Sequence, residues 1–161
     1  MLIHLSKSII YAIHSLYYMS YYVKDRPVMV RELCDAFDFP YDSVLKILRQ
    51  LSRARLLLTH RGSKGGFTLR VDLKDINLLV LIEAIEGPVE VMDPLPDELG
   101  DKKLRDTTHN IFSSLVSDYK SLLKNINCDM LFKWRGLEKS EITSAMPDGA
   151  TLNLSEIKED K

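Results

Sequence analysis

The chain has 161 residues, of which 45% are hydrophobic and 28% are charged, so it can form one globular domain with a substantial core. It contains no run of roughly 18 apolar residues that would span a membrane, and its N-terminus lacks the pattern of a secretory signal. Its two cysteines, Cys34 and Cys128, form neither a disulfide framework nor a spaced metal motif. These features favour a reduced, cytoplasmic protein.

The charges are strongly segregated along the chain, although the formal net charge is only −1. Residues 43–71 contain seven Lys or Arg residues and no acid. Residues 75–101 contain eight acids and no Lys or Arg. A basic segment of this kind is either a solvated face or the binding surface for a polyanion, and its lack of interleaved acids favours nucleic acid.

Helical periodicity dominates the first third of the chain. Residues 6–23 predict a helix with Ser6 as its N-cap, and Pro27 lies just beyond its end. Residues 30–37 and 41–54 predict two shorter helices joined by a tight turn. The second of them has an apolar stripe and a basic outer face, so the pair describes a helix-turn-helix.

Two strand-like segments follow at residues 56–59 and 67–71, and the glycines between them predict a β-hairpin. A helix-turn-helix followed by a hairpin is a winged helix, so the predicted fold class is mainly α with a small β-hairpin. Another helix is expected from about Asn77 to the Gly87-Pro88 stop signal. An acidic loop is predicted for residues 89–101.

A long helix is predicted from residue 102 to about residue 126. A helix of ~25 residues is about 37 Å long, which exceeds what so small a domain needs, so we expect it to pack against a second copy of the chain. The predicted domains are a winged helix at 1–88, the acidic loop, a dimerisation helix at 102–132 and a polar, partly flexible tail at 133–161. The predicted dimer interface consists of Leu104, Ile111, Phe112, Leu115, Tyr119, Leu122 and Ile126.

The basic segment predicts contacts with double-stranded DNA. The N-terminal residues of a recognition helix reach base edges in the major groove, whereas later cations meet phosphates. In the wing, Arg61 suits a narrow minor groove. A nucleotide-binding loop is a poor alternative, because the wing glycines lie between two strands at neither of the required spacings. The predicted DNA-contacting residues are Ser6, Lys7, Tyr11, Tyr41, Asp42, Ser43, Lys46, Arg49, Arg53, Arg61, Ser63 and Lys64.

Candidate residues for catalysis or metal binding are sparse. The sequence shows no nucleophile–base pair and no paired carboxylates at a strand end, so no enzymatic activity is predicted. Its four histidines are scattered, so no metal site is predicted. Cys34 lies on an apolar helix face and is expected to be a small buried hydrophobe. Cys34 and Cys128 are nevertheless the candidates for a redox role.

Four motifs occur in order over roughly residues 1–130: HLSKSIIYAI, LKILRQLSRARLL, RGSKGGFTL and INLLVLIEAIEGP. They are similar to the opening segment, the recognition helix, the wing and the following helix of the IscR/NsrR/CymR (Rrf-two) family of bacterial winged-helix regulators. The resemblance implies a homodimer that binds a palindromic operator. It also implies that Arg61 is a wing contact to DNA.

The chain departs from this family in two places. Many members ligate an iron–sulfur cluster through three cysteines after Glu-Gly-Pro, whereas residues 89–103 contain no cysteine here. His109 lies near a fourth ligand position of some members but cannot hold a cluster alone, so no cofactor is predicted. Arg55 occupies a position where the family usually has glycine. Cluster-free members imply sensing through a protein partner or a thiol, and a small-molecule effector is a further candidate.

The predicted function is therefore a dimeric, sequence-specific DNA-binding transcription regulator, and specifically a repressor. Two alternatives stay open. The first is a winged-helix module that binds protein and not DNA. The second is a redox- or metal-responsive regulator that uses unusual ligands such as His4, Cys34 or His109.

Overall fold

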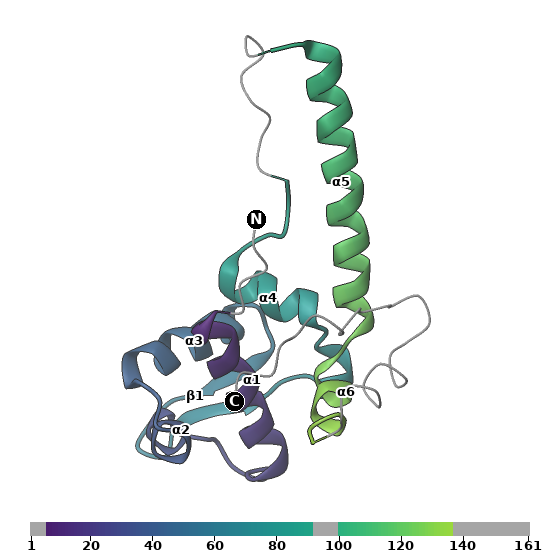
Figure 1. Cartoon of the computed structure of the whole chain (residues 1–161). Helices are drawn as coiled ribbons and strands as arrows, with labels where there is room; N and C mark the ends of the chain where they lie inside the picture. Colours follow the sequence, from purple (N-terminus) through teal and green to yellow (C-terminus); the bar gives the residue numbers. More distant parts are fainter. Residues whose placement is uncertain (1–5, 92–99, 137–161) are drawn as a thin grey trace, which may run out of the picture.

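The helix-turn-helix lies in a helical body from which one long helix projects (Figure 1). The computed structural model describes residues 6–91 and 100–136. Helix α1 (Lys7–Tyr21) begins at the predicted cap, because the Ser6 side chain accepts a hydrogen bond from the Ile9 backbone N–H. Three predicted features lie wholly or partly outside the described residues. They are residues 92–99 of the acidic loop, residues 137–161 of the polar tail, and His4.

Helices α2 (Val30–Phe37) and α3 (Tyr41–Arg53) form the helix-turn-helix. Asp38 ends α2 in the left-handed conformation, with φ at 54°. The apolar stripe of α3 recurs at three- and four-residue intervals and turns into the core, where it packs against α1 and α2. The buried residues of this stripe are Val44, Ile47, Leu48 and Leu51.

Strands β1 (Leu57–His60) and β2 (Gly66–Leu69) pair antiparallel and form the wing. A third segment is tied to β2, because the backbone N–H and C=O groups of Val28 and Phe67 exchange two hydrogen bonds of 2.9 Å. Gly66 lies against this junction. A Cβ atom on Gly66 would lie 2.4 Å from the Val28 carbonyl oxygen, so only glycine fits there.

A short 3₁₀ helix, η1 (Leu73–Asp75), leads into α4 (Leu78–Glu86). The Asn77 side chain caps α4 by accepting from the Val80 backbone N–H, and α4 ends at Gly87 as predicted. Helix α5 (Lys102–Asn125) projects from the body, and α6 (Cys128–Lys133) follows it at the base. The predicted helix at 102–132 is therefore two helices.

The break between α5 and α6 has a local cause, a capping residue, and a non-local one, two hydrogen bonds to the start of α4. Asn127 is the N-cap of α6, since its side chain accepts from the Met130 backbone N–H. Its neighbours are tied to the start of α4: the Leu78 N–H donates to the Ile126 carbonyl and the Cys128 N–H to the Ile76 carbonyl, both at 2.8 Å. These bonds hold the base of α5 against the body.

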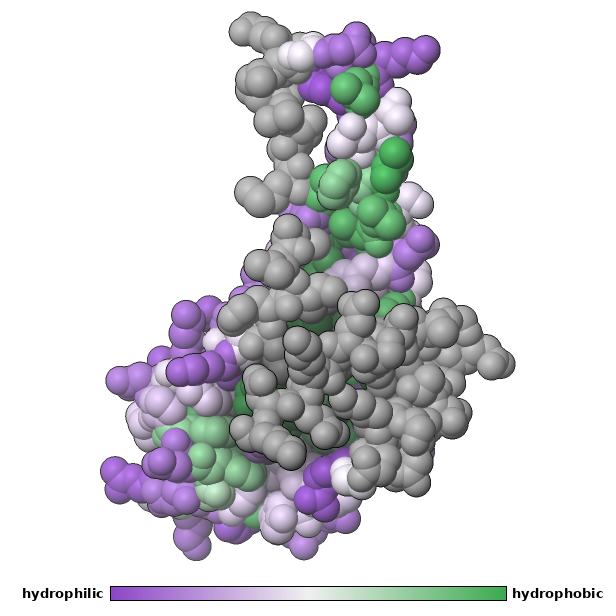
Figure 2. Space-filling model, viewed as in Figure 1, coloured by the Kyte–Doolittle hydropathy of each residue, from purple (hydrophilic) through white to green (hydrophobic). Residues whose placement is uncertain are grey.

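Most of α5 is exposed, and Leu123 is its one buried residue. A row of large apolar side chains therefore faces solvent along its shaft (Figure 2). These residues are Leu104, Ile111, Phe112 and Leu115, each 54% to 66% exposed. Tyr119 and Leu122 are half-buried. Ile126, the last residue of the predicted interface, is 5% exposed within the protomer, so little of its side chain is available to a partner. Within the described part of the chain, no helix is both long and apolar enough to cross a bilayer.

Arg55, two residues beyond the end of α3, is a non-glycine residue with a positive φ of 63°. The Leu56 N–H donates back to the Leu51 carbonyl at 3.0 Å, as in a Schellman-type ending that favours glycine at this position. A left-handed conformation costs a residue with a Cβ atom roughly 1–2 kcal/mol. The left-handed backbone at residue 55 therefore favours glycine, and the arginine found there is under backbone strain.

We expect Arg55→Gly to raise the free energy of unfolding by roughly 0.5–1 kcal/mol, because the relief of strain is partly offset by the greater entropy of glycine in the unfolded chain. Denaturant unfolding measures this change. Arg55→Ala is the matched control, since it removes the same charge and keeps the Cβ atom. An equal gain in both variants would show that charge, and not backbone strain, is responsible.

Candidate nucleic-acid interface

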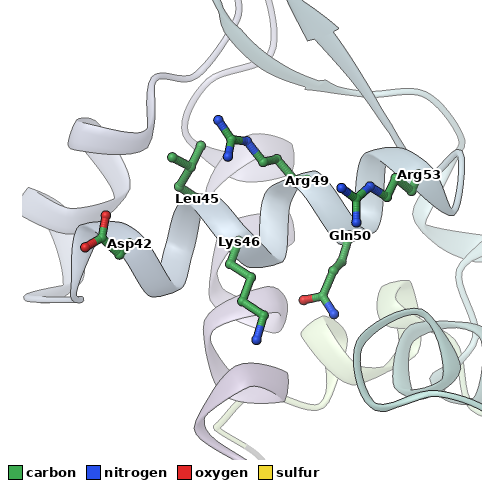
Figure 3. A pocket seen from close by; sticks show the side chains of 6 residues that line it. All are labelled: Asp42, Leu45, Lys46, Arg49, Gln50 and Arg53. Carbon is green, nitrogen blue, oxygen red and sulfur yellow. The ribbon is translucent and has the colours of Figure 1, made fainter.

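The outer face of α3 forms a shallow pocket of about 300 Å³ that is lined mainly by polar and charged side chains (Figure 3). Lys46 and Gln50 point to one side of the helix, and Leu45 and Arg49 point to the other. The two rows follow from helix geometry, because residues four apart lie above one another on the same face. The lining residues are Asp42, Leu45, Lys46, Arg49, Gln50 and Arg53.

The tip of the wing is rich in exposed polar and basic side chains: Arg61, Ser63 and Lys64. Its turn is tight, because the Gly65 N–H donates to the Gly62 carbonyl at 2.9 Å. A Cβ atom on Gly65 would lie 2.5 Å from the carbonyl oxygen of His60, so a side chain does not fit. The wing therefore presents its three polar side chains on a constrained loop.

A groove of about 610 Å³ separates the wing from the helix-turn-helix. The exposed side chain of Tyr41 lies at the start of α3, and Arg31, which the sequence reasoning did not single out, lies in the first turn of α2. Both line this groove with Ser63 of the wing. The groove thus brings predicted contacts from α3 and the wing to one surface.

The predicted contacts at the start of α1 behave differently from one another. The Ser6 hydroxyl donates to the Glu86 carboxylate and accepts from the Ile9 N–H, so both of its roles are filled within the chain. Tyr11 is half-buried, and its ring centroid lies 4.4 Å from that of Phe39. Lys7 is exposed. Of the three predicted residues, Lys7 has the side chain most available to a ligand.

The basic residues of α3 and the wing form no salt bridge with any residue in the part of the chain that the structure describes. Among residues 6–91 and 100–136, the salt bridges are Arg26–Glu32, Lys120–Glu83 and Lys133–Asp129. None of these pairs uses a cation from the segment 43–71. The cations Lys46, Arg49, Arg53, Arg61 and Lys64 are all exposed. They can therefore pair with an external anion without first breaking an internal ion pair.

The two thiols are poorly suited to redox chemistry. Cys128 is fully buried, and burial raises the pKa of its thiol to about 12. Cys34 is half-buried, and burial, with a smaller contribution from Asp35, also raises the pKa of its thiol. Because the thiolate is the reactive form, both shifts disfavour attack or oxidation at neutral pH.

The donor set does not fit an iron–sulfur cluster. A cluster held by three cysteine thiolates needs three cysteines, and the chain has two. No group of three or more His, Cys, Asp or Glu side chains in the described ranges is arranged to hold a metal ion. His109 is exposed on α5, and Cys128 lies in the core.

One side-chain contact at this surface escaped the sequence reasoning. Gln50 falls among the outward positions of α3, yet its side-chain Nε2 donates to the Ile85 carbonyl at the end of α4 at 3.0 Å. Periodicity gave one hint, because Gln50 adjoins the buried Leu51 and lies three positions from the buried Ile47. The partner carbonyl lies 35 residues away, and no local pattern could identify it.

The chain matches the family model described as "Rrf2: Iron-dependent Transcriptional regulator" over residues 5–133. BadM of Rhodopseudomonas palustris, named as an HTH-type transcriptional regulator, is 25% identical over 132 residues, which are 81% of this chain and 82% of BadM. The HTH-type transcriptional regulator NsrR of Shouchella clausii is 23% identical over 83 residues, which are 52% of this chain and 56% of NsrR.

Solved structures show the same fold. CymR (YrzC), the global cysteine regulator of B. subtilis, matches with a TM-score of 0.64 at 16% identity, over 83% of this chain and 98% of CymR. T. potens IscR matches with a TM-score of 0.59 at 15% identity, over 87% of this chain and 92% of IscR. The predicted winged-helix fold class and family resemblance are confirmed. The chain belongs to the Rrf2 family, whose members are transcription regulators and not enzymes.

Proposed function

We propose that this protein is a homodimeric repressor that binds a palindromic DNA operator in the cytoplasm. The observation that carries the proposal is the set of exposed cations on α3 and the wing that have no internal ion-pair partner in the described part of the chain. Such cations release condensed counterions when they meet phosphates, and that release drives binding. The raised pKa values of the buried Cys128 thiol and the half-buried Cys34 thiol favour a regulator that does not sense through its own cysteines.

Each element has a distinct role in the proposed complex. The first turns of α3, with Tyr41, Asp42, Ser43 and Lys46, face base edges in the major groove. Arg49 and Arg53 lie further along α3 and contact phosphates. Arg61 enters the minor groove, where a narrow groove concentrates negative potential. The sugar–phosphate backbone of the DNA is contacted by Ser63, Lys64 and Lys7.

The exposed apolar row on α5 is the proposed dimer interface. Leu104, Ile111, Phe112 and Leu115 are all more than half exposed in the protomer, and a helix of 24 residues offers a seam for a second copy. In the proposed dimer, a two-fold axis relates the two recognition helices, which contact half-sites about one DNA turn apart, roughly 34 Å. The predicted palindrome follows from that symmetry.

Selection of bound sequences from a random DNA pool tests the proposal, followed by binding measurements at several salt concentrations. We expect Arg61→Ala to weaken operator binding. It should also reduce the magnitude of the slope of log affinity against log salt by about 0.9, because the protein loses one cation that neutralises DNA charge. We expect Lys46→Ala to relax the preference for one base pair by about 1–3 kcal/mol.

Lys133→Ala is the matched control, since it also removes one exposed cation. Lys133 lies on α6, across the body from α3, and pairs with Asp129 at 2.8 Å (Figure 1). Its loss should leave both the operator affinity and the salt slope at the parental values. A parent protein that selects no sequence and shifts no DNA at low salt would favour the protein-interaction alternative.

A further inference from the structure

Gln50 forms a hydrogen bond from the outer face of α3, which is the proposed DNA-facing surface, to α4. It lines the same shallow pocket as Lys46 and Arg49 and lies on the same side of α3 as Lys46 (Figure 3). Its Nε2 donates to the Ile85 carbonyl, one of the last four carbonyls of α4, which lack a partner inside the helix. Gln50 therefore caps the C-terminus of α4 from a neighbouring helix.

The capping role is needed because the chain turns away at this point. The Val89 N–H, which would reach the Ile85 carbonyl if α4 continued, donates instead to the Glu83 carboxylate at 3.2 Å. Gly87 ends α4 with φ at 94°. The Ile85 carbonyl would otherwise depend on water, and Gln50 supplies the donor.

Helix α4 is itself fixed to α5 at two points. Near its start, the Leu78 N–H donates to the Ile126 carbonyl at 2.8 Å. In its second half, Glu83 pairs with Lys120 of α5 at 3.5 Å, and both side chains are 33% exposed. Two attachments along one helix resist rotation as well as separation, so α4 and the base of α5 behave as one unit.

We propose that Gln50 is a positioning residue that fixes the orientation of α3 relative to α5. Apolar side chains of α3 and α4 share one core and resist separation, and the hydrogen bond from Gln50 adds a directional constraint between the two helices. In a dimer joined through α5, the angle of each α3 to its own α5 sets the distance between the two recognition helices. Gln50 thereby helps to set the half-site spacing of the operator; this inference rests on the proposed function.

The test compares operators whose half-sites are separated by the selected spacing or by one or two base pairs more or fewer. Gln50→Met keeps the length of the side chain and removes the donor. We expect it to weaken binding at the selected spacing about fivefold, the net effect of one hydrogen bond, and to bring the affinities for the other spacings closer to that value. The preferred half-site sequence and the salt slope should not change.

Gln50→Lys is the rescue variant, because its ammonium group can still donate to the Ile85 carbonyl. It should restore the spacing preference and, since it adds a cation to the DNA-facing surface, raise the salt slope by up to about 0.9. Thermal unfolding of both variants confirms that the fold is kept.

Three outcomes would overturn the inference or its foundation, and they are distinguishable. An unchanged spacing preference in Gln50→Met would show that Gln50 does not position α3. A changed base preference at one position of the half-site, with the spacing preference intact, would make Gln50 a base contact instead. Failure of the parent protein to bind any of the operators, or to prefer any spacing, would contradict the proposed function itself.

Discussion

Replacing Phe112 and Leu115 together by glutamate should yield a folded monomer that binds the operator about 100-fold more weakly than the parent protein. Both side chains are more than half exposed in the protomer, at 54% and 57%. Burial in an interface would stabilise the dimer by roughly 1.5–3 kcal/mol for each, and a buried unpaired carboxylate reverses that gain. Loss of the second half-site contact then removes an avidity of about 10²–10⁴.

Sedimentation measures the oligomeric state, and gel shifts measure operator affinity. Asn110→Glu combined with Ser117→Glu is the matched control, because it adds two carboxylates to exposed positions on the opposite side of α5. The control should stay dimeric. A Phe112/Leu115 variant that remains a dimer would move the interface elsewhere, and dissociation of both variants would show that added charge alone is sufficient.

The second large effect is expected at Gly66. Gly66→Ala should lower the free energy of unfolding by about 3 kcal/mol, because the new methyl group would overlap backbone atoms that cannot move aside. Its Cβ atom would lie 2.4 Å from the Val28 carbonyl oxygen and 2.7 Å from the carbonyl carbon. Relief of this clash would break the two hydrogen bonds between Val28 and Phe67, which anchor the wing.

Gly62→Ala provides the comparison for Gly66→Ala in denaturant unfolding. Gly62 also has a positive φ, at 104°, but a Cβ atom there would meet no other atom within 4 Å. Its replacement should therefore cost only the conformational preference of glycine, about 1 kcal/mol. If the two variants lose equal stability, the close approach at Val28 is not the cause of the Gly66 requirement.

Local signals in the sequence predicted the element boundaries well. Helix α2 spans the predicted residues, Ser6 caps α1 as expected, and α4 begins next to Asn77 as expected. These features depend on a few neighbouring residues: a polar cap before an apolar period, and a glycine after it. The strands differ by a residue or two from the prediction, because pairing across the hairpin and not composition decides where each strand ends.

Non-local contacts explain what the sequence did not reveal. Ile126 continues the apolar period of Leu115 and Leu122, yet it is buried because the chain folds back and the Leu78 N–H binds its carbonyl. Periodicity identifies an apolar face but not what covers that face. The same limit applies to α6 and to the bond between Gln50 and Ile85, whose partners are distant in sequence. The assigned DNA contacts and dimer residues stay predictions until the binding experiments are done.

Among the described residues, α5 is attached to the body near its base, through Leu78–Ile126 and Glu83–Lys120, so this helix can act as a lever. Its 24 residues extend about 36 Å, so a tilt of 5° at the base would displace the far end by about 3 Å. In the proposed dimer, where the second copy sits on the distant part of α5, a small rotation of the body against α5 would be magnified between the two proposed DNA-binding surfaces. A ligand or partner that shifts the junction of Leu78 and Ile126 slightly could therefore change the reach of the whole dimer.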